Sequence, residues 1–225
     1  MRPSDAATVS IAVDERLYVS GLHLVPARPW ACLVFAHGAG AGMTHPFMAD
    51  VSAGLGERGV ATLRYQFPFM ERGAKHTDPP RLAQATVRAA WREAARLSPG
   101  LPLFAGGKSY GGRMTSMAQA VAPLPGIRGM IFVGFPLHPA GRPSQDRAGH
   151  LLHVQVSMLF LQGTRDRLAD LQQLQPLITQ LGEGATLKLF AEADHSFHVP
   201  SRTGRTDQDV RQELLDTIAA WIAQH

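Results

Sequence analysis

The sequence predicts an α/β protein with a mostly parallel central sheet, helices on both faces and no separate cap domain. Short apolar runs alternate with helical patterns along the chain, which is typical of repeated strand–helix–strand units. The length of 225 residues suits one domain, residues 1–225, with a substantial core. No repeat, low-complexity tract or linker divides the sequence.

The first half of the chain begins with a predicted hairpin, followed by buried strands and two helices. The expected strands are Thr8–Val13, Arg16–Val25, Ala31–Ala36 and Val60–Tyr65, and the expected helices are Pro46–Arg58 and Pro80–Leu97. The last helix carries Leu82, Val87 and Trp91 at helical spacing, so these residues form its inner face. A loop, Gln66–Pro80, precedes that helix.

The second half continues the alternation of strands and helices. The expected strands are Leu101–Ala105, Ile127–Val133, Met158–Gln162 and Thr186–Phe190, and the expected helices are Gly111–Ala122, Leu168–Leu181 and Thr206–Ala223. One remaining segment, Pro136–Gln155, has room for a small lid but is too short for a cap domain.

Composition and charge favour an ordinary globular enzyme over a nucleic-acid-binding or membrane protein. The net charge of +4 comes from scattered basic residues, without a basic run or interleaved aromatic residues. The segment Met1–Ser10 lacks a signal-peptide pattern, and no apolar stretch is long enough to cross a membrane. The single cysteine, Cys32, lies in an apolar run and is expected to be a buried strand residue. We therefore expect a cytoplasmic protein.

The segment Gly106–Gly112 reads G-G-K-S-Y-G-G and directly follows the apolar run Leu101–Ala105. It contains the pattern G-x-S-x-G where a strand ends and a helix begins, which is the context of a nucleophile elbow. Such an elbow holds its serine, here Ser109, in a strained turn that exposes the hydroxyl at the carboxyl edge of the sheet. Ser109 is therefore the predicted nucleophile.

A phosphate-binding loop is the competing interpretation, because Gly107-Lys108-Ser109 also resembles the end of G-x-x-x-x-G-K-S. That motif requires glycine at position 102, which is Pro102 in this chain. The strand also runs up to Ala105 and leaves no space for a phosphate cradle. The nucleotide-binding interpretation is therefore rejected.

An activated serine needs a base, and the base needs an acidic partner that fixes its tautomer. Asp166 follows the strand Met158–Gln162, and His195 follows the strand Thr186–Phe190. The order Ser109, Asp166, His195 is the order found in enzymes built on such an elbow. All three positions fall on loops at the carboxyl edge of the sheet, where open α/β sheets bind ligands.

Each assignment has an alternative. Asp166 could cap the following helix, with Asp170 as the second candidate acid. His198 competes with His195, and the two histidines together raise the possibility of a metal site. No carboxylate or cysteine at ligand spacing completes such a site, so no metal or other cofactor is expected.

The oxyanion formed during acyl transfer needs two preorganised donors. The backbone N–H of Tyr110, directly after the nucleophile, supplies one. The loop His37–Met43 follows the strand Ala31–Ala36, and its Ala39 N–H is the best candidate for the other, with Gly40 second.

Two further loops follow strands at the same rim, Phe67–Gly73 and Phe135–Pro139. Their apolar side chains, Phe69 and Leu137 first, are expected to form the substrate-binding wall. Glu71, Arg72 or His138 would add a polar contact, unless Glu71 and Arg72 pair with each other or face water.

The combined motifs resemble the α/β-hydrolase superfamily over nearly the whole chain. The loops at Phe67–Gly73 and Phe135–Pro139 resemble those of small, cap-less bacterial hydrolases. This group is similar to dienelactone-hydrolase-like proteins and to the testis-expressed and histone-acetyltransferase-complex-subunit relatives of the fold. Dienelactone hydrolases use a cysteine nucleophile, whereas this chain has Ser109, so the resemblance implies a reaction class and not a substrate.

We therefore expect a serine hydrolase, a carboxylesterase or thioesterase acting on a small-molecule ester or thioester, without nucleic-acid or membrane partners. The sequence sets no oligomeric state. The alternative is a non-catalytic binding or scaffold protein on the same fold.

Overall fold

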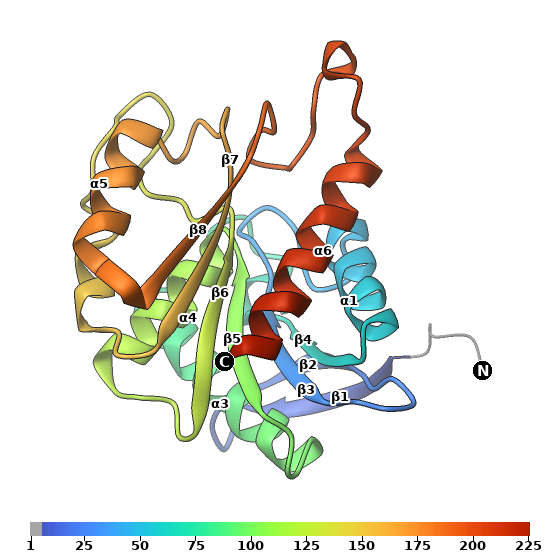
Figure 1. Cartoon of the computed structure of the whole chain (residues 1–225). Helices are drawn as coiled ribbons and strands as arrows, with labels where there is room; N and C mark the ends of the chain where they lie inside the picture. Colours follow the sequence, from blue (N-terminus) through green and yellow to red (C-terminus); the bar gives the residue numbers. More distant parts are fainter. Residues whose placement is uncertain (1–5) are drawn as a thin grey trace.

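The computed structural model of the chain describes residues 6–225. Its centre is an eight-stranded sheet with the strand order β1-β2-β4-β3-β5-β6-β7-β8 (Figure 1). The strands β1 (Ala7–Ala12) and β2 (Tyr18–Leu24) are antiparallel to each other, and β2 is antiparallel to β4. All other neighbours are parallel, which confirms the predicted sheet. Residues 1–5, which are part of the segment Met1–Ser10, lie outside the described residues.

The remaining elements alternate along the chain, as the apolar pattern predicts. The parallel strands are β3 (Ala31–Ala36), β4 (Val60–Tyr65), β5 (Leu103–Lys108), β6 (Ile127–Val133), β7 (Ser157–Gly163) and β8 (Ala185–Phe190). The helices are α1 (Pro46–Glu57), α2 (Pro68–Glu71), α3 (Pro80–Leu97), α4 (Tyr110–Val121), α5 (Leu171–Leu181) and α6 (Asp207–Gln224). Short 3₁₀ helices η1 (Gly149–His153), η2 (Gly182–Gly184) and η3 (Ser201–Thr203) lie between them.

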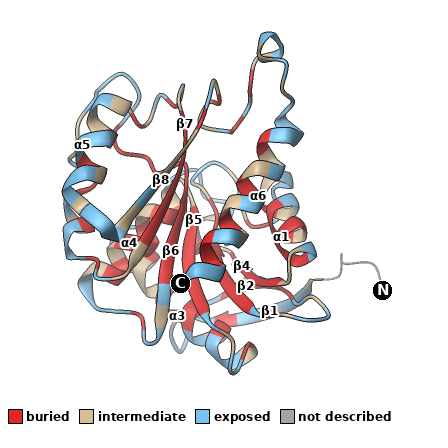
Figure 2. Ribbon diagram, viewed as in Figure 1, coloured by how far each residue is buried: buried red, intermediate tan, exposed pale blue. Residues whose placement is uncertain are grey.

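Both faces of the sheet are covered by helices, because alternate side chains of each central strand point to opposite sides. On one face, Phe35 and Phe104 pack with apolar residues of α1 and α6. On the other face, Val34 and Ala105 pack against α3 and α4, while α5 covers the far end of the sheet. Figure 2 shows the central strands buried between these layers. Each fully buried large apolar side chain contributes about 1.5–3 kcal/mol to this core.

The strand β3 lies between β4 and β5. After β3 the chain continues to β4 on one side of the sheet, whereas after β5 it continues to β6 on the other side. The loops after β3 and β5 therefore run in opposite directions. Open α/β sheets bind ligands in the crevice that such a switch creates. The loop that starts at His37 and the turn at Ser109 therefore meet at one edge. Near the start of β3, Cys32 is fully buried, and burial raises the pKa of its thiol to about 11.

Apart from shifts of one or two residues at other element ends, three elements differ from the sequence prediction. The strand β5 continues to Lys108, beyond the predicted end at Ala105, because Gly106 packs directly on β6: a Cβ there would lie 1.8 Å from the carbonyl oxygen of Ile131. The short helix α2 interrupts the predicted loop Gln66–Pro80. The helix α5 begins at Leu171 rather than Leu168 because Asp170 caps it, its Oδ1 accepting the N–H of Gln172 at 2.7 Å.

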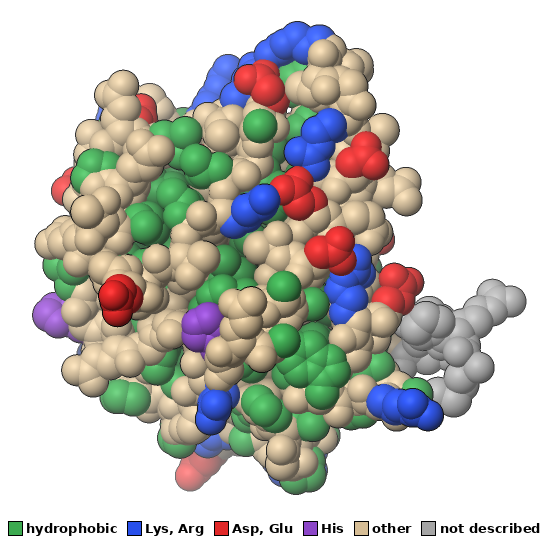
Figure 3. All heavy atoms as spheres, viewed as in Figure 1, with side chains coloured by type: hydrophobic (Ala, Val, Ile, Leu, Met, Phe, Trp, Pro, Cys, Tyr) green, Lys and Arg blue, Asp and Glu red, His purple; other side chains and the backbone are tan. Residues whose placement is uncertain are grey.

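Charged side chains are mixed on the molecular surface. On the face seen in Figure 3, Lys and Arg lie among Asp and Glu and form no large patch of one sign. Within residues 6–225, no helix combines the length and the apolar character needed to cross a bilayer.

Candidate active site

The predicted elbow is present between β5 and α4. Ser109 has φ 51° and ψ −117°, a backbone conformation that costs a non-glycine residue about 1–3 kcal/mol. Two neighbours must lack a side chain for the turn to fit. A Cβ on Gly107 would come within 2.6 Å of Ala36 O, and one on Gly111 within 2.5 Å of His37 O. The glycines therefore allow the turn to press against β3 while the serine hydroxyl stays at the sheet edge.

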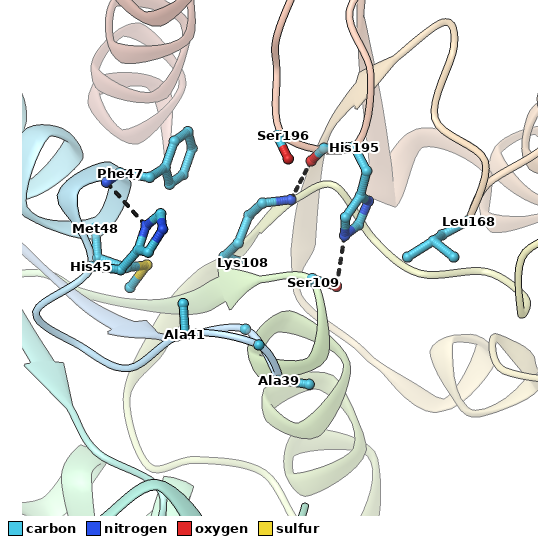
Figure 4. A pocket seen from close by; sticks show the side chains of 12 residues that line it. Ala39, Ala41, His45, Phe47, Met48, Lys108, Ser109, Leu168, His195 and Ser196 are labelled. Atoms are coloured by element: carbon cyan, nitrogen blue, oxygen red, sulfur yellow. Dashed lines mark hydrogen bonds between the residues drawn. The ribbon is translucent and has the colours of Figure 1, made fainter. Parts of the chain in front are cut away.

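The structure brings Ser109, His195 and Asp166 into one hydrogen-bonded chain. Ser109 Oγ lies 2.9 Å from His195 Nε2, a contact drawn in Figure 4, and His195 Nδ1 lies 2.6 Å from Asp166 Oδ2. A carboxylate accepts, so Nδ1 carries the proton and Nε2 is free to accept one from the serine. The three predicted residues thus have the geometry of nucleophile, base and orienting acid.

The carboxylate of Asp166 is fully buried and held by two further donors. Gln162 Nε2 donates to Oδ2 at 2.5 Å, and the N–H of Leu168 donates to Oδ1 at 2.8 Å. Sequence reasoning missed Gln162. The signal was a polar residue at the end of the apolar run Met158–Leu161, at the same edge as the predicted acid.

The competing residues have other partners. Asp170 caps α5, so that role does not fall to Asp166. His198 is exposed and pairs with Asp207 at 2.9 Å, and this hydrogen bond raises the pKa of His198. Across residues 6–225, no three His, Cys, Asp or Glu side chains converge in the manner of a metal site.

A cavity of about 420 Å³ opens beside Ser109 and His195, a volume suited to a small molecule. Its wall consists of the loop after β3, the start of α1 and the loops after β5, β7 and β8: Gly38, Ala39, Gly40, Ala41, His45, Phe47, Met48, Lys108, Ser109, Leu168, His195 and Ser196. The predicted oxyanion donor Ala39 is on this wall. Tyr110 is the first residue of α4, where backbone N–H groups have no acceptor within the helix.

The profile of the α/β hydrolase domain family matches residues 29–223. The chain belongs to the α/β-hydrolase family. Its fold is similar to that of a dienelactone hydrolase from Anabaena variabilis, with 18% identity, a TM-score of 0.79 and coverage of 100% of this chain and 99% of that one. A lid-less α/β serine hydrolase from Xanthomonas campestris shares 22% identity, a TM-score of 0.74 and coverage of 97% and 96%. An esterase domain from Rhodothermus marinus shares 17% identity, a TM-score of 0.72 and coverage of 96% of each chain.

In this hydrolase, a buried histidine fixes the loop that carries Ala39, the predicted oxyanion donor. The Nε2 atom of His37 accepts the N–H of Phe67 at 2.9 Å, so Nδ1 carries the proton and donates to Gly38 O at 2.7 Å. The ring lies against Phe67 and Phe69, with centroid distances of 5.0 and 5.8 Å. Burial lowers the pKa of His37 to about 4. The neutral ring therefore links the loop that carries Ala39 to the loop after β4.

A second histidine makes the same kind of link on the other side of Ser109. The Nε2 atom of His138 accepts the N–H of Asp170 at 2.8 Å, and Nδ1 donates to Pro139 O at 2.8 Å. The backbone N–H of His138 also donates to Leu168 O at 3.0 Å. Both ring nitrogens therefore bond to backbone groups, and His138 is not the polar substrate contact considered from the sequence.

The structure does not bring the predicted substrate-binding wall to the cavity. Phe69 is fully buried in the core and packs on Tyr110 at a centroid distance of 5.9 Å. Leu137 is fully buried among the apolar residues beneath the β6–β7 loops. Neither touches the cavity, because both loops turn their apolar side chains inwards. The segment Pro136–Gln155, considered above as a small lid, also turns side chains inwards, because its Ala148 and Leu151 are buried in the same cluster as Leu137.

The charged residues of the first loop serve its own structure. Glu71 accepts from the hydroxyl of Ser20 at 2.6 Å and from its backbone N–H at 3.2 Å. Arg72 pairs with the buried Asp78 at 2.7 Å, which in turn accepts the N–H of Phe69 at 2.7 Å. Glu71 and Arg72 are both exposed, as the alternative of side chains facing water expected; neither lines the cavity, and they do not pair with each other.

The actual wall contains residues that were not predicted to contact the substrate. The apolar part includes Phe47, Met48 and Leu168, and Lys108 is its long basic side chain. The sequence places Lys108 between Gly107 and Ser109, where it fits the rejected nucleotide motif but gives no sign of the direction of its side chain.

Proposed function

We propose that this protein is a serine hydrolase, a carboxylesterase or thioesterase that acts on a small acyl substrate through an acyl-enzyme intermediate. The observation that carries the proposal is the continuous chain of hydrogen bonds from Ser109 Oγ through His195 to Asp166, at 2.9 and 2.6 Å, on the wall of a cavity. A serine hydroxyl is a weak nucleophile until a positioned base takes its proton.

In the first step, Ser109 Oγ attacks the carbonyl carbon of the substrate while its proton passes to His195 Nε2. The imidazolium that forms is stabilised by Asp166, whose carboxylate already accepts the Nδ1–H. His195 then protonates the leaving alcohol or thiol. In the second step, the same histidine removes a proton from water, which hydrolyses the acyl-enzyme.

The tetrahedral intermediate places a negative charge on the former carbonyl oxygen. The N–H groups of Ala39 and Tyr110 are the proposed donors to this oxygen, from the cavity wall and from the N-terminus of α4 respectively. The positive end of the α4 dipole favours the same charge. None of these steps requires a cofactor.

The alternative, a binding protein without catalysis, would be favoured by the loss of a catalytic side chain. All three side chains are present and bonded in sequence, and the fold is shared with proteins described as esterases and serine hydrolases.

The test uses Ser109→Ala with Ser201→Ala as the control, since Ser201 is exposed on η3. We expect wild type and Ser201→Ala to hydrolyse p-nitrophenyl esters or acyl thioesters and to be labelled by a fluorophosphonate. Ser109→Ala should lose the labelling and lower kcat by roughly 10⁴-fold or more, with an unchanged circular dichroism spectrum. Turnover of Ser109→Ala at the wild-type rate would exclude the proposed mechanism, and an unlabelled, inactive wild type would favour the binding protein.

A further inference from the structure

Lys108 is the last residue of β5 and shares the cavity with Ser109. Figure 4 shows its side chain lying between the α1 side of the cavity, with Phe47 and Met48, and the side of His195. The ammonium Nζ donates to the carbonyl oxygen of His195 at 2.5 Å and lies 5.5 Å from the ring centroid of Phe197.

The positive charge of Lys108 has no carboxylate partner in the described part of the chain, where its hydrogen bond to His195 O is its single bond. An ammonium has three N–H donors, so two remain. Burial lowers the pKa of Lys108 to about 8, and the more distant Asp166 and Asp194 act in the opposite direction. The side chain is therefore mainly protonated at neutral pH, although an unpaired charge away from water is unfavourable.

Lys188 provides an internal comparison. Its Nζ lies 5.7 Å from the ring centroid of Phe190, close to the 5.5 Å between Lys108 Nζ and the ring of Phe197. The protein gives Lys188 a carboxylate, because Glu213 Oε1 lies 2.5 Å from Nζ. Among residues 6–225, no carboxylate does the same for Lys108, which lies on the cavity wall beside Ser109.

The rest of the cavity wall is compatible with an anion. It has no acidic side chain, and its other titratable groups are His45 and His195. The nearest buried acid, Asp166, is fully bonded to His195, Gln162 and Leu168. A negatively charged group would therefore meet an available cation and no direct repulsion.

Building on the proposed function, we propose that Lys108 determines specificity and that the substrates are esters or thioesters carrying an anionic group, such as a carboxylate. This group accepts hydrogen bonds from the remaining N–H donors of Lys108. It belongs either to the acyl part or to the leaving group, and the test distinguishes the two.

The experiment compares kcat/KM within two pairs of esters. The acyl pair is p-nitrophenyl hydrogen adipate and its methyl ester, and the leaving-group pair is 4-carboxyphenyl butyrate and the methyl ester of that compound. We expect wild type to prefer the charged member of one pair by roughly ten- to a hundredfold. Lys108→Met should reduce that preference to within about threefold, whereas Lys108→Arg should keep part of it. Lys188→Met is the matched control and should keep it all.

Taking a ratio within each pair removes any general effect of Lys108 on His195, because both members depend equally on the catalytic base. If wild type shows no preference in either pair, or if Lys108→Met slows both members alike, Lys108 serves only to hold the His195 backbone. A measurement without variants covers the case of misfolding: adipate should inhibit wild type at least tenfold more strongly than adipamide, and equal inhibition would refute the proposal. Fluorophosphonate labelling and hydrolysis of the neutral esters test the proposed function separately.

Discussion

Two buried histidines bridge backbone loops on opposite sides of the nucleophile and do so with the same bonds. In each ring, Nδ1 donates to the carbonyl of the next residue, Gly38 for His37 and Pro139 for His138. In each ring, Nε2 accepts an N–H from the loop that follows the neighbouring parallel strand, from Phe67 and from Asp170. A neutral imidazole suits this position because it offers one donor and one acceptor to backbone groups that burial would leave unpaired.

The two histidines differ in whether the neighbouring site residue, Asp166 or Ala39, has other contacts that hold it in place. Next to His138, the acid Asp166 has its own contacts with Gln162 and with the N–H of Leu168. Next to His37, the proposed donor at Ala39 is a backbone N–H, and its position depends on the conformation of the loop itself. The same bridge is therefore expected to control catalysis on one side and mainly stability on the other.

The largest expected effect is that of His37→Phe on catalysis. The ring keeps its aromatic contacts but loses both hydrogen bonds, so the loop that carries the proposed donor Ala39 is no longer fixed. We expect kcat to fall roughly 10²- to 10³-fold, the range seen when an oxyanion donor is lost, with a much smaller change in KM. Steady-state kinetics with a p-nitrophenyl ester measure this. A change confined to KM would mean that the loop binds substrate without stabilising the transition state.

The second effect concerns acid stability. The unfolded state protonates His37 near pH 6.5, whereas the folded state does so only near pH 4. Between these values the unfolded state binds more protons than the folded state. The free energy of unfolding therefore falls by roughly 3 kcal/mol as the pH drops from above 6.5 to 4. Urea unfolding at pH 7 and pH 4 measures the loss.

His37→Gln is the control for this titration, because it cannot ionise. His150, whose pKa burial also lowers to about 4, contributes equally to wild type and variant. The loss in wild type should therefore exceed the loss in His37→Gln. Equal losses in the two proteins would show that His37 is not the titrating group.

The smallest effect is expected for His138→Phe. The N–H of Asp170 and the carbonyl of Pro139 lose their partner, which should lower the free energy of unfolding by about 1–3 kcal/mol. The contacts of Asp166 remain, so kcat should stay within about tenfold of wild type. Urea unfolding and kinetics on the same sample measure both. A loss of activity as large as that of His37→Phe would contradict the expectation that His138 mainly affects stability.

The order of strands and helices could be predicted from sequence because each apolar run is short and bounded by turn residues. The elbow was also predictable, because the pattern G-x-S-x-G directly follows an apolar strand, although the space that Gly107 and Gly111 leave is needed by β3 and His37, which are distant in the chain. Asp166 and His195 followed because parallel strands bring their carboxyl ends to one edge. Their meeting with Ser109 depends on the strand order, which the family resemblance implied.

The cavity wall could not be predicted, because residues of the same type occur on both sides of a rim loop. Phe69 turns into the core beside His37, while Phe47, at the start of α1, reaches the cavity. Their sequence surroundings do not distinguish these directions, which depend on how each loop leaves its strand. Likewise, the end of β5 was misplaced because glycine usually interrupts strands, whereas Gly106 is needed for close packing on β6.

The place of Cys32 on β3, a strand inside the sheet, separates this enzyme's chemistry from thiol reactivity. The sole cysteine of the chain is fully buried, and its raised pKa keeps it in the thiol form, which is a poor nucleophile. An alkylating reagent or a thiol oxidant can reach the sulfur only when the centre of the sheet opens. Modification of this sulfur is therefore a consequence of unfolding and cannot serve to regulate the folded protein.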